Sequence, residues 1–240
     1  MAEWLAEAGI NLNAGVGGQA HGGHGPDVAG EESRERMMRL LNAWRTEANA
    51  PEILAYDVEL VDSVKSALKD QADALEAMFD EVDEEERERR HFTSTLYQIE
   101  MERVRYSLAR YLRTRILKIE DSLDHILTNL DMLDRLSWGE KALAQKLNEI
   151  NGNHFEDHLM GPLSKMEGNP NEGFTNRDRV EHAKPQLTEF VFIMALDDLP
   201  EVVMDETNDG NISTLRRGEV WVVRYERIMR EVLQGNAILL

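Results

Sequence analysis

The sequence predicts a mainly α-helical protein with a small C-terminal β-rich domain. Apolar residues recur at helical spacing over most of residues 31–163, but after Pro185 they alternate with polar residues or form short continuous runs. Glycine and proline interrupt the polar stretch between these regions, which is typical of a linker. We therefore expect a flexible tail at 1–30, an α-helical domain at 31–163, a linker at 164–184 and a β-rich domain at 185–240.

The composition excludes several classes of protein. Among 240 residues, 27 Lys and Arg stand against 46 Asp and Glu, and this net charge of −19 repels a phosphate backbone, so we expect no autonomous nucleic-acid binding. The absence of cysteine excludes disulfides, thiolate nucleophiles and cysteine-based metal sites. No apolar run approaches the roughly 20 residues that a membrane helix needs, so we expect no membrane association.

Two amphipathic helices are expected before residue 80. The first runs from Glu31 to about Asn49, with an apolar stripe at spacings of four, three and four: Met37, Leu41, Trp44 and Ala48. The second is expected to begin after Pro51, because proline suits a first helical turn. The almost wholly charged run at 80–90 is typical of a solvated face or a loop.

One long helix is predicted from Thr93 to about Leu133, and the helical bundle is expected to be built on it. No proline or glycine interrupts this stretch, which would be roughly 60 Å long at 1.5 Å per residue. We expect it to pack against several helices, some of them from another chain. Its apolar stripe is Tyr97, Met101, Val104, Leu108, Tyr111, Ile116, Ile119, Leu123, Ile126, Leu130 and Leu133.

A capping box predicts where the fourth helix starts, since the Ser137 hydroxyl and the Glu140 carboxylate can bind each other's backbone N–H. Gly152 is expected to weaken or interrupt this helix. After Pro185, a turn is expected at Arg217–Gly218 and a short helix from Tyr225 to Leu233, ended by Gly235. The apolar runs predict strands at residues 190–194, 202–204, 220–225 and 238–240.

Two histidines form a weak candidate for a catalytic metal site. His154 and His158 stand at i and i+4 on one helical face, beside Glu156 and Asp157, and this spacing can bind zinc. No third ligand is evident, and a partly exposed helix end is the simpler interpretation. A metal-dependent hydrolase using these two histidines is therefore kept as the alternative function.

Residues Gly15–Ala20 match the glycine pattern of a dinucleotide-binding loop, but the pattern is permissive and His21–Pro26 follow it, so chance is the better interpretation. No Walker A loop or nucleophile elbow is present, and no cofactor is expected.

Basic residues cluster on the predicted long helix of this acidic chain: Arg103, Arg105, Arg110, Arg113, Arg115 and Lys118. Three interpretations stay open. These residues could pair with carboxylates of the same chain, such as Glu100, Glu102, Glu120 or the acidic run near residue 80. They could instead meet an acidic neighbouring subunit, or they could contact phosphates.

Several stretches together resemble the Sld-five family of GINS complex subunits. The order of these stretches and the helical-then-β layout agree over roughly residues 35–240. The stretches are Asn42–Glu47, Ala50–Leu54, Tyr97–Tyr106, Tyr111–Glu120, Leu136–Ser137 and Gly235–Leu240.

The resemblance implies a non-catalytic structural subunit located in the nucleus. It implies a heterotetramer with three related GINS subunits, bound with MCM and Cdc-forty-five in the replicative helicase during initiation and elongation of DNA replication. The helical domain would form the tetramer core, and the β-rich domain would support assembly. A generic coiled-coil adaptor, in which a fragment 93–133 self-associates, is a third possibility.

We expect subunit contacts from the apolar stripe and arginines of the long helix, and from aromatic residues outside it. The expected interface residues are Trp44, Tyr97, Met101, Arg103, Val104, Leu108, Tyr111, Arg115, Ile116, Ile119, Trp221 and Tyr225. A further hypothesis concerns the tail, where four apolar residues could dock a replisome adaptor or simply form an unstructured end: Trp4, Leu5, Ile10 and Leu12.

Overall fold

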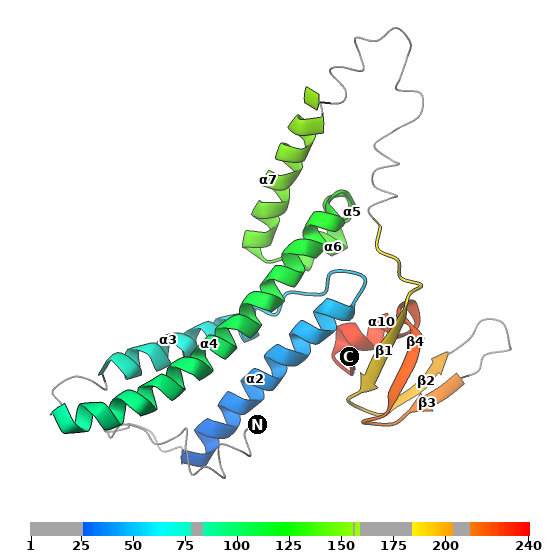
Figure 1. Ribbon diagram of the computed structural model, residues 1–240. Helices are drawn as coiled ribbons and strands as arrows, with labels where there is room; N and C mark the ends of the chain where they lie inside the picture. Colours follow the sequence, from blue (N-terminus) through cyan, green and yellow to red (C-terminus); the bar gives the residue numbers. More distant parts are fainter. Residues whose placement is uncertain (1–25, 78–83, 156, 159–183, 204–211) are drawn as a thin grey trace, which may run out of the picture. The chain divides into compact units, whose positions relative to one another are not determined.

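The computed structural model confirms a mainly helical chain that ends in a small antiparallel β region (Figure 1). It describes residues 26–77, 84–155, 157, 158, 184–203 and 212–240. The helices are α2 (Pro26–Asn49), α3 (Val58–Ala77), α4 (Glu84–Asp121), α5 (Leu123–Thr128), α6 (Leu130–Asp134), α7 (Trp138–Phe155) and α10 (Tyr225–Gln234). The strands are β1 (Phe190–Ala195), β2 (Leu199–Val203), β3 (Ile212–Leu215), β4 (Val220–Arg224) and β5 (Ala237–Leu239).

The chain divides into two compact units. Unit 1 comprises Met1–Leu41 and Glu59–Ala109, and unit 2 comprises Asn42–Val58 and Arg110–Leu240, each as far as its residues are described. The predicted division into tail, helical domain, linker and β-rich domain is not tested by these bounds and stays a prediction. The adaptor-docking residues of the tail lie outside the described residues, as does nearly all of the predicted linker.

The first two helices differ from the prediction in where they begin. The first starts at Pro26 instead of Glu31, in keeping with the tolerance of a first helical turn for proline. The second starts at Val58, well after Pro51. Residues 50–57 form a non-helical connection, the α2–α3 segment, and Ala50 and Ile53 within it are buried. The face of α2 that is most buried contains Leu40 and Glu47, whereas the predicted stripe residue Ala48 is exposed.

A single helix from Thr93 to Leu133 is not observed, because α4 ends at Asp121 and two short helices follow it. Asn129 separates α5 from α6, with an extended backbone at φ −110° and ψ 113°, and its side chain accepts a hydrogen bond from Asp131 N–H at 3.0 Å. Asn129 is thus the C-cap of α5 and the N-cap of α6, so the helix breaks here without any proline or glycine.

After these breaks, α5, α6 and α7 contribute residues to a helical core in unit 2. Ile119, at the end of α4, shares this core with Ile53 of the α2–α3 segment and with Ala144 of α7. The other buried members are Leu123, Ile126, Met132 and Leu136. The predicted interruption at Gly152 does not occur, because α7 continues to Phe155 and this exposed glycine costs only about 1 kcal/mol relative to alanine.

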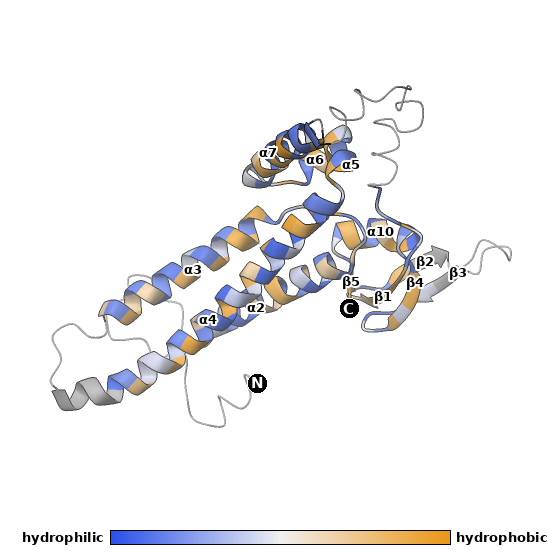
Figure 2. Ribbon diagram, turned by 45° about the horizontal axis from the view of Figure 1, so that its top comes forward, coloured by the Kyte–Doolittle hydropathy of each residue, from blue (hydrophilic) through white to orange (hydrophobic). Residues whose placement is uncertain are grey.

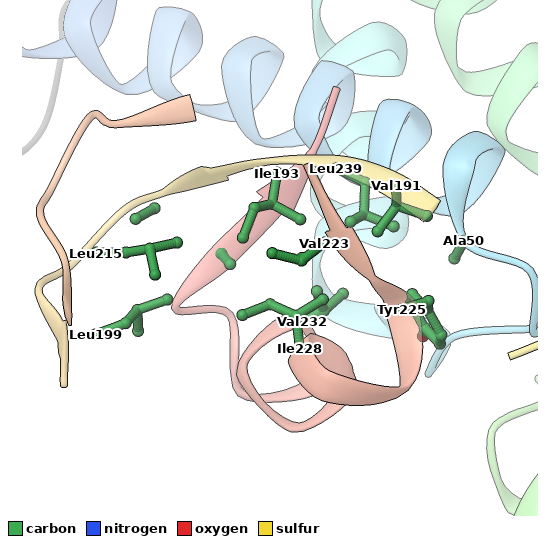
Figure 3. Packing of buried hydrophobic residues seen from close by; sticks show 12 residues of the cluster. Ala50, Val191, Ile193, Leu199, Leu215, Val223, Tyr225, Ile228, Val232 and Leu239 are labelled. Atoms are coloured by element: carbon green, nitrogen blue, oxygen red, sulfur yellow. The ribbon is translucent and has the colours of Figure 1, made fainter. Parts of the chain in front are cut away.

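The C-terminal module, which runs from β1 to β5 and includes α10, has its own apolar core. Antiparallel strands lie in the order β4-β1-β5, and β2 pairs with β3 in a second sheet. Val191 and Ile193 of β1 and Ile228 of α10 are buried in the core shown in Figure 3. β3 was missed from the sequence, whereas the predicted α10 is confirmed, and it ends at Gln234 with Gly235 as its cap, at a φ of 81°. The predicted turn at Arg217–Gly218 is also present.

Candidate subunit interface

A buried group of charges lies in unit 2, where three cations meet three carboxylates. The Arg115 side chain is fully buried, and that of Glu47 is 1% exposed. We call the group the Arg115 cluster: Glu47, Glu52, Arg115, Lys118, Arg135 and Glu140. Because a charge is costly to remove from water unless it is paired, equal numbers of both signs allow Arg115 and the three carboxylates to be buried, while Lys118 and Arg135 stay 16% and 18% exposed.

The guanidinium of Arg115 donates five hydrogen bonds, as many as it has N–H groups. Nε and Nη2 bind the two carboxylate oxygens of Glu140 at 2.7 and 3.1 Å, and Nη1 binds Oε2 of Glu47 at 2.9 Å. The carbonyl oxygens of Leu54 and Arg135 accept the remaining bonds at 2.8 and 3.1 Å. The group therefore holds α2, the α2–α3 segment, α4 and the start of α7 together.

The other two cations complete the pairing. Lys118 donates to Oε1 of Glu47 at 2.9 Å and to the carbonyl of Glu52 at 2.8 Å, and it also bonds the carbonyl of Glu47. Arg135 pairs with Oε2 of Glu52 at 2.8 Å and donates to the carbonyl of Ile53 at 2.9 Å. Within the part of the chain that the structure describes, no buried side-chain nitrogen or oxygen lacks a hydrogen-bond partner.

Two opposing effects determine the pKa values in the cluster. Burial disfavours the charged form of each group, and pairing with an opposite charge favours it. Burial opposes the charge on Arg115 and on Glu140, but their mutual hydrogen bonds and charges outweigh it, so the pKa of Arg115 is raised and that of Glu140 is lowered. For Lys118, burial outweighs the attraction of Glu47, and its pKa is lowered. Burial also raises the pKa of Tyr111 to about 12, and its ring lies 5.9 Å from the Arg115 guanidinium carbon.

Glu140 has a second role at the start of α7. Its Oε2 accepts a hydrogen bond from Ser137 N–H at 2.8 Å, while Ser137 Oγ accepts one from Glu140 N–H at 3.3 Å. The predicted capping box is thereby confirmed. One carboxylate thus caps a helix and neutralises a buried arginine, so the start of α7 is fixed relative to α4.

An open groove lies on unit 1 and is lined by residues of α2 and α4. Ile99 and Tyr106 are 52% and 60% exposed, and they stand with Thr95 and Glu102 at spacings of three and four along α4. This second stripe was not recognised as an interface in the sequence, although its helical period could have indicated it. The groove is lined by Met37, Leu41, Thr95, Gln98, Ile99, Met101, Glu102, Arg103, Arg105, Tyr106 and Ser107.

The C-terminal module carries a second exposed apolar surface on one face of its three-stranded sheet. Phe192 of β1 lies opposite Val222 of β4, and both are at least half exposed. Phe190 is 67% exposed, and the guanidinium carbon of Arg224 lies 5.4 Å from its ring centroid. β4 is largely coloured as hydrophobic in Figure 2. Exposed apolar surface of this kind is typical of a protein–protein contact.

The expected interface residues fall into three groups by exposure. Leu108, Tyr111, Arg115, Ile119 and Tyr225 are buried within the chain, so in this structure their side chains support the fold. Five others are half-buried: Trp44, Tyr97, Met101, Val104 and Ile116. Arg103 and Trp221 are exposed. The structure brings Met101 and Arg103 together in the groove of unit 1.

Pairing within the chain accounts for several of the basic residues on α4. Nη1 of Arg103 binds Glu100 at 2.7 Å, and Arg105 pairs with Glu102. The partners of Arg115 and Lys118 are distant in the sequence, and they are not the carboxylates expected from proximity along the chain.

The histidine pair is exposed, with the rings of His154 and His158 4.5 Å apart between centroids. Glu156 lies outside the described residues. No group of three or more metal-ligating side chains is found within the described ranges. In the same ranges, no helix combines the length and the hydrophobicity required to cross a membrane.

Family models match two parts of the chain. Residues 63–159 match the GINS complex protein helical bundle domain, and residues 185–240 match the C-terminus of the DNA replication complex GINS protein SLD5. The chain belongs to the SLD5 family. The resemblance found in the sequence is thereby confirmed. The two matches lie on the helical part of the chain and on the C-terminal module, in that order.

Relatives in the SLD5 family come from distant eukaryotes. The DNA replication complex GINS protein SLD5 of Chaetomium globosum is 29% identical over 210 residues, which is 87% of this chain and 91% of that protein. The protein of the same name in Arabidopsis thaliana is 27% identical, over 84% of this chain and 89% of its own length. The human protein is 26% identical, over 86% and 89%.

Proposed function

We propose that the chain is a non-catalytic structural subunit of a heterotetrameric GINS complex, in which it assembles with three related subunits. Membership of the SLD5 family supports this proposal, since the relatives are named DNA replication complex GINS proteins. The complex would act with MCM and Cdc-forty-five in the replicative helicase, in initiation and elongation of DNA replication. We accordingly place the protein in the nucleus.

The main support for the proposal is that apolar side chains stay exposed on α4, a helix on which several basic residues are paired within the chain. Ile99 and Tyr106 line a groove instead of a core. Burying apolar surface contributes about 25 cal/mol per Å², so covering this groove with a helix from another subunit would stabilise the assembly. The half-buried predicted interface residue Met101 borders the same groove. We propose that this groove is one subunit contact and that the exposed sheet face of the C-terminal module is another.

Co-expression with the three related subunits tests the proposal. We expect the four chains to co-purify at equal stoichiometry, and Ile99→Glu to weaken the complex because it places a carboxylate in an apolar contact. The matched control is Ile150→Glu on α7, since Ile150 is 54% exposed and Ile99 is 52% exposed. A chain that purifies alone as a soluble, cooperatively folded monomer indifferent to these subunits would contradict the proposal.

The same preparation addresses the hydrolase alternative. We expect no stoichiometric metal in the purified complex, and we expect replacement of His154 and His158 by alanine to leave assembly unchanged. A bound metal that is lost with these two histidines would favour the enzyme instead.

The tail is proposed to dock a replisome adaptor through its apolar residues Trp4, Leu5, Ile10 and Leu12. Deleting residues 2–29 is expected to reduce adaptor capture and to leave the four-subunit complex intact. Equal capture by the full-length and truncated chains would contradict this part of the proposal.

A further inference from the structure

The α2–α3 segment of unit 2 contributes to two separate cores. Ile53 is buried in the helical core with Ile119 and Ala144. Ala50 is buried in the core of the C-terminal module, where it lies beside Tyr225 (Figure 3). Leu54 packs against that second core as well. A short stretch of chain therefore lies between the helical core and the C-terminal module and packs against both.

Glu52 connects the two sides by hydrogen bonds. Its Oε2 pairs with Arg135 of the helical side at 2.8 Å, and its Oε1 accepts a bond from the hydroxyl of Tyr225 at 2.8 Å. The Glu52 side chain is 1% exposed, so water does not compete for either bond. A weaker contact lies nearby, where Thr46 Oγ1 accepts a bond from Leu239 N–H at 3.4 Å.

The C-terminal module needs such contacts to hold its position. Residues 156–189 lie between α7 and β1 in the sequence, and the described contacts between the module and the helical side include those of Ala50 and Glu52. Of the twelve buried residues described in the module core, Ala50 alone comes from outside the module. The module therefore keeps most of its core when it is separated from the α2–α3 segment.

We propose that Glu52 is a positioning residue that fixes the C-terminal module on the helical core of unit 2, and that breaking its bond to Tyr225 releases the module as a folded body. This inference rests on contacts within the chain and not on the proposed function. It assigns to Glu52 a role in orientation, beyond the pairing of a buried charge.

Hydrogen exchange at two adjacent backbone amides distinguishes release of the C-terminal module from its unfolding. Leu239 N–H bonds Thr46 across the docking contact, whereas Leu240 N–H bonds the carbonyl of Phe192 within the sheet at 3.0 Å. Release exposes the first amide and leaves the second protected. Hydrogen exchange on the full-length chain, resolved to single residues by mass spectrometry, measures both rates in one experiment.

Tyr225→Phe is the decisive variant, because it removes the hydroxyl and keeps the buried ring. We expect exchange at Leu239 to accelerate on the order of tenfold, the factor that corresponds to one hydrogen bond to a charged group. Exchange at Leu240 should not change. Glu52→Gln keeps an oxygen that can accept the hydroxyl but removes the negative charge, so we expect it to weaken the same bond and to act in the same direction by a smaller factor. The double variant should add little to Tyr225→Phe, because both changes act on the one bond between these side chains.

The control is Glu102→Gln, the same substitution in an exposed pair with Arg105, and it should change neither rate. Unchanged exchange at Leu239 in Tyr225→Phe would overturn the proposal. Equal acceleration at Leu239 and Leu240 would also overturn it, because the module would then be unfolding and not separating.

Discussion

Arginines in two parts of α4 pair with glutamates in opposite environments. Arg103, in unit 1, binds Glu100 one turn away, and these side chains are 45% and 37% exposed. Arg115, in unit 2, is fully buried and binds Glu47 and Glu140, which are 68 and 25 residues away in the sequence. The residue types and the distances between their atoms are similar, so the difference lies in the surrounding solvent and in what each pair connects.

An ion pair that is present in a structure does not necessarily stabilise it, and the contribution depends on burial. In water, an exposed pair gains little because solvent already satisfies both charges. Inside the protein, removing one partner leaves the other charge without water or a counter-charge. Arg115 is therefore expected to matter far more than Arg103, although both look alike in the sequence.

The largest expected effect is that of Arg115→Met, which leaves Glu140 buried without its arginine and Glu47 with Lys118 alone. We expect a loss of about 3–5 kcal/mol in the free energy of unfolding. Chemical denaturation of the full-length chain, followed by circular dichroism, measures it. A loss below about 1 kcal/mol would contradict this expectation, because exposed ion pairs contribute no more than that.

A smaller loss in the free energy of unfolding is expected when the pH is lowered into the acid range. The folded-state pKa of Glu140 is lowered, so its contribution to stability is present above the ordinary value of 4.5 and is lost as the pH falls below that value through the folded-state pKa. Glu140→Gln should flatten this part of the pH profile of stability. Denaturation of the parent chain and of Glu140→Gln at a series of pH values from neutral to acid measures the difference. Identical pH profiles of stability would contradict the assignment of this effect to Glu140.

Ser137→Ala removes the hydroxyl that accepts the Glu140 N–H bond at the start of α7. We expect a loss of about 1 kcal/mol, typical of a helix cap. Pairing of Glu140 with Arg115 should survive, and the Ser137 hydroxyl is the smallest of the groups that lower the Glu140 pKa, so the acid dependence of stability should change far less than in Glu140→Gln. Thermal or chemical unfolding measures the first effect, and repetition across pH measures the second.

The smallest effect is expected for Arg103→Met on the exposed part of α4. Its pair with Glu100 spans one helical turn and contributes less than about 0.5 kcal/mol. The stability of the isolated chain should hardly change, whereas the assembly could still respond, because Arg103 borders the groove of unit 1. Denaturation and co-purification of the same variant separate these two effects.

Periodicity predicted α2, α3, α7, α10 and most of the strands, and the Ser137–Glu140 motif predicted the capping box, but neither predicted where the long helix breaks. The predicted long helix breaks first at Ser122, between α4 and α5, and again at Asn129, whose side chain caps the start of α6, and no apolar pattern indicates either break. β3 (Ile212–Leu215) is short and is not a continuous apolar run, so its sequence alone did not predict a strand.

The Arg115 cluster was missed because its carboxylates are distant along the chain. A signal was nevertheless present, since Arg115 stands four residues from both Tyr111 and Ile119, inside the apolar stripe. A charge on such a stripe indicates a buried pair, although the sequence does not identify its partners. The buried position of Glu47 is likewise on the face of α2 that includes Leu40.

The bond between Glu52 and Tyr225 joins residues 173 positions apart, and this separation affects how the protein is made. During translation, the glutamate leaves the ribosome long before the tyrosine exists, and Arg135 is synthesised between them. The helical part can therefore form around Glu52 first, with one carboxylate oxygen left for the last region to be synthesised. Docking of the C-terminal module then becomes the closing step of folding.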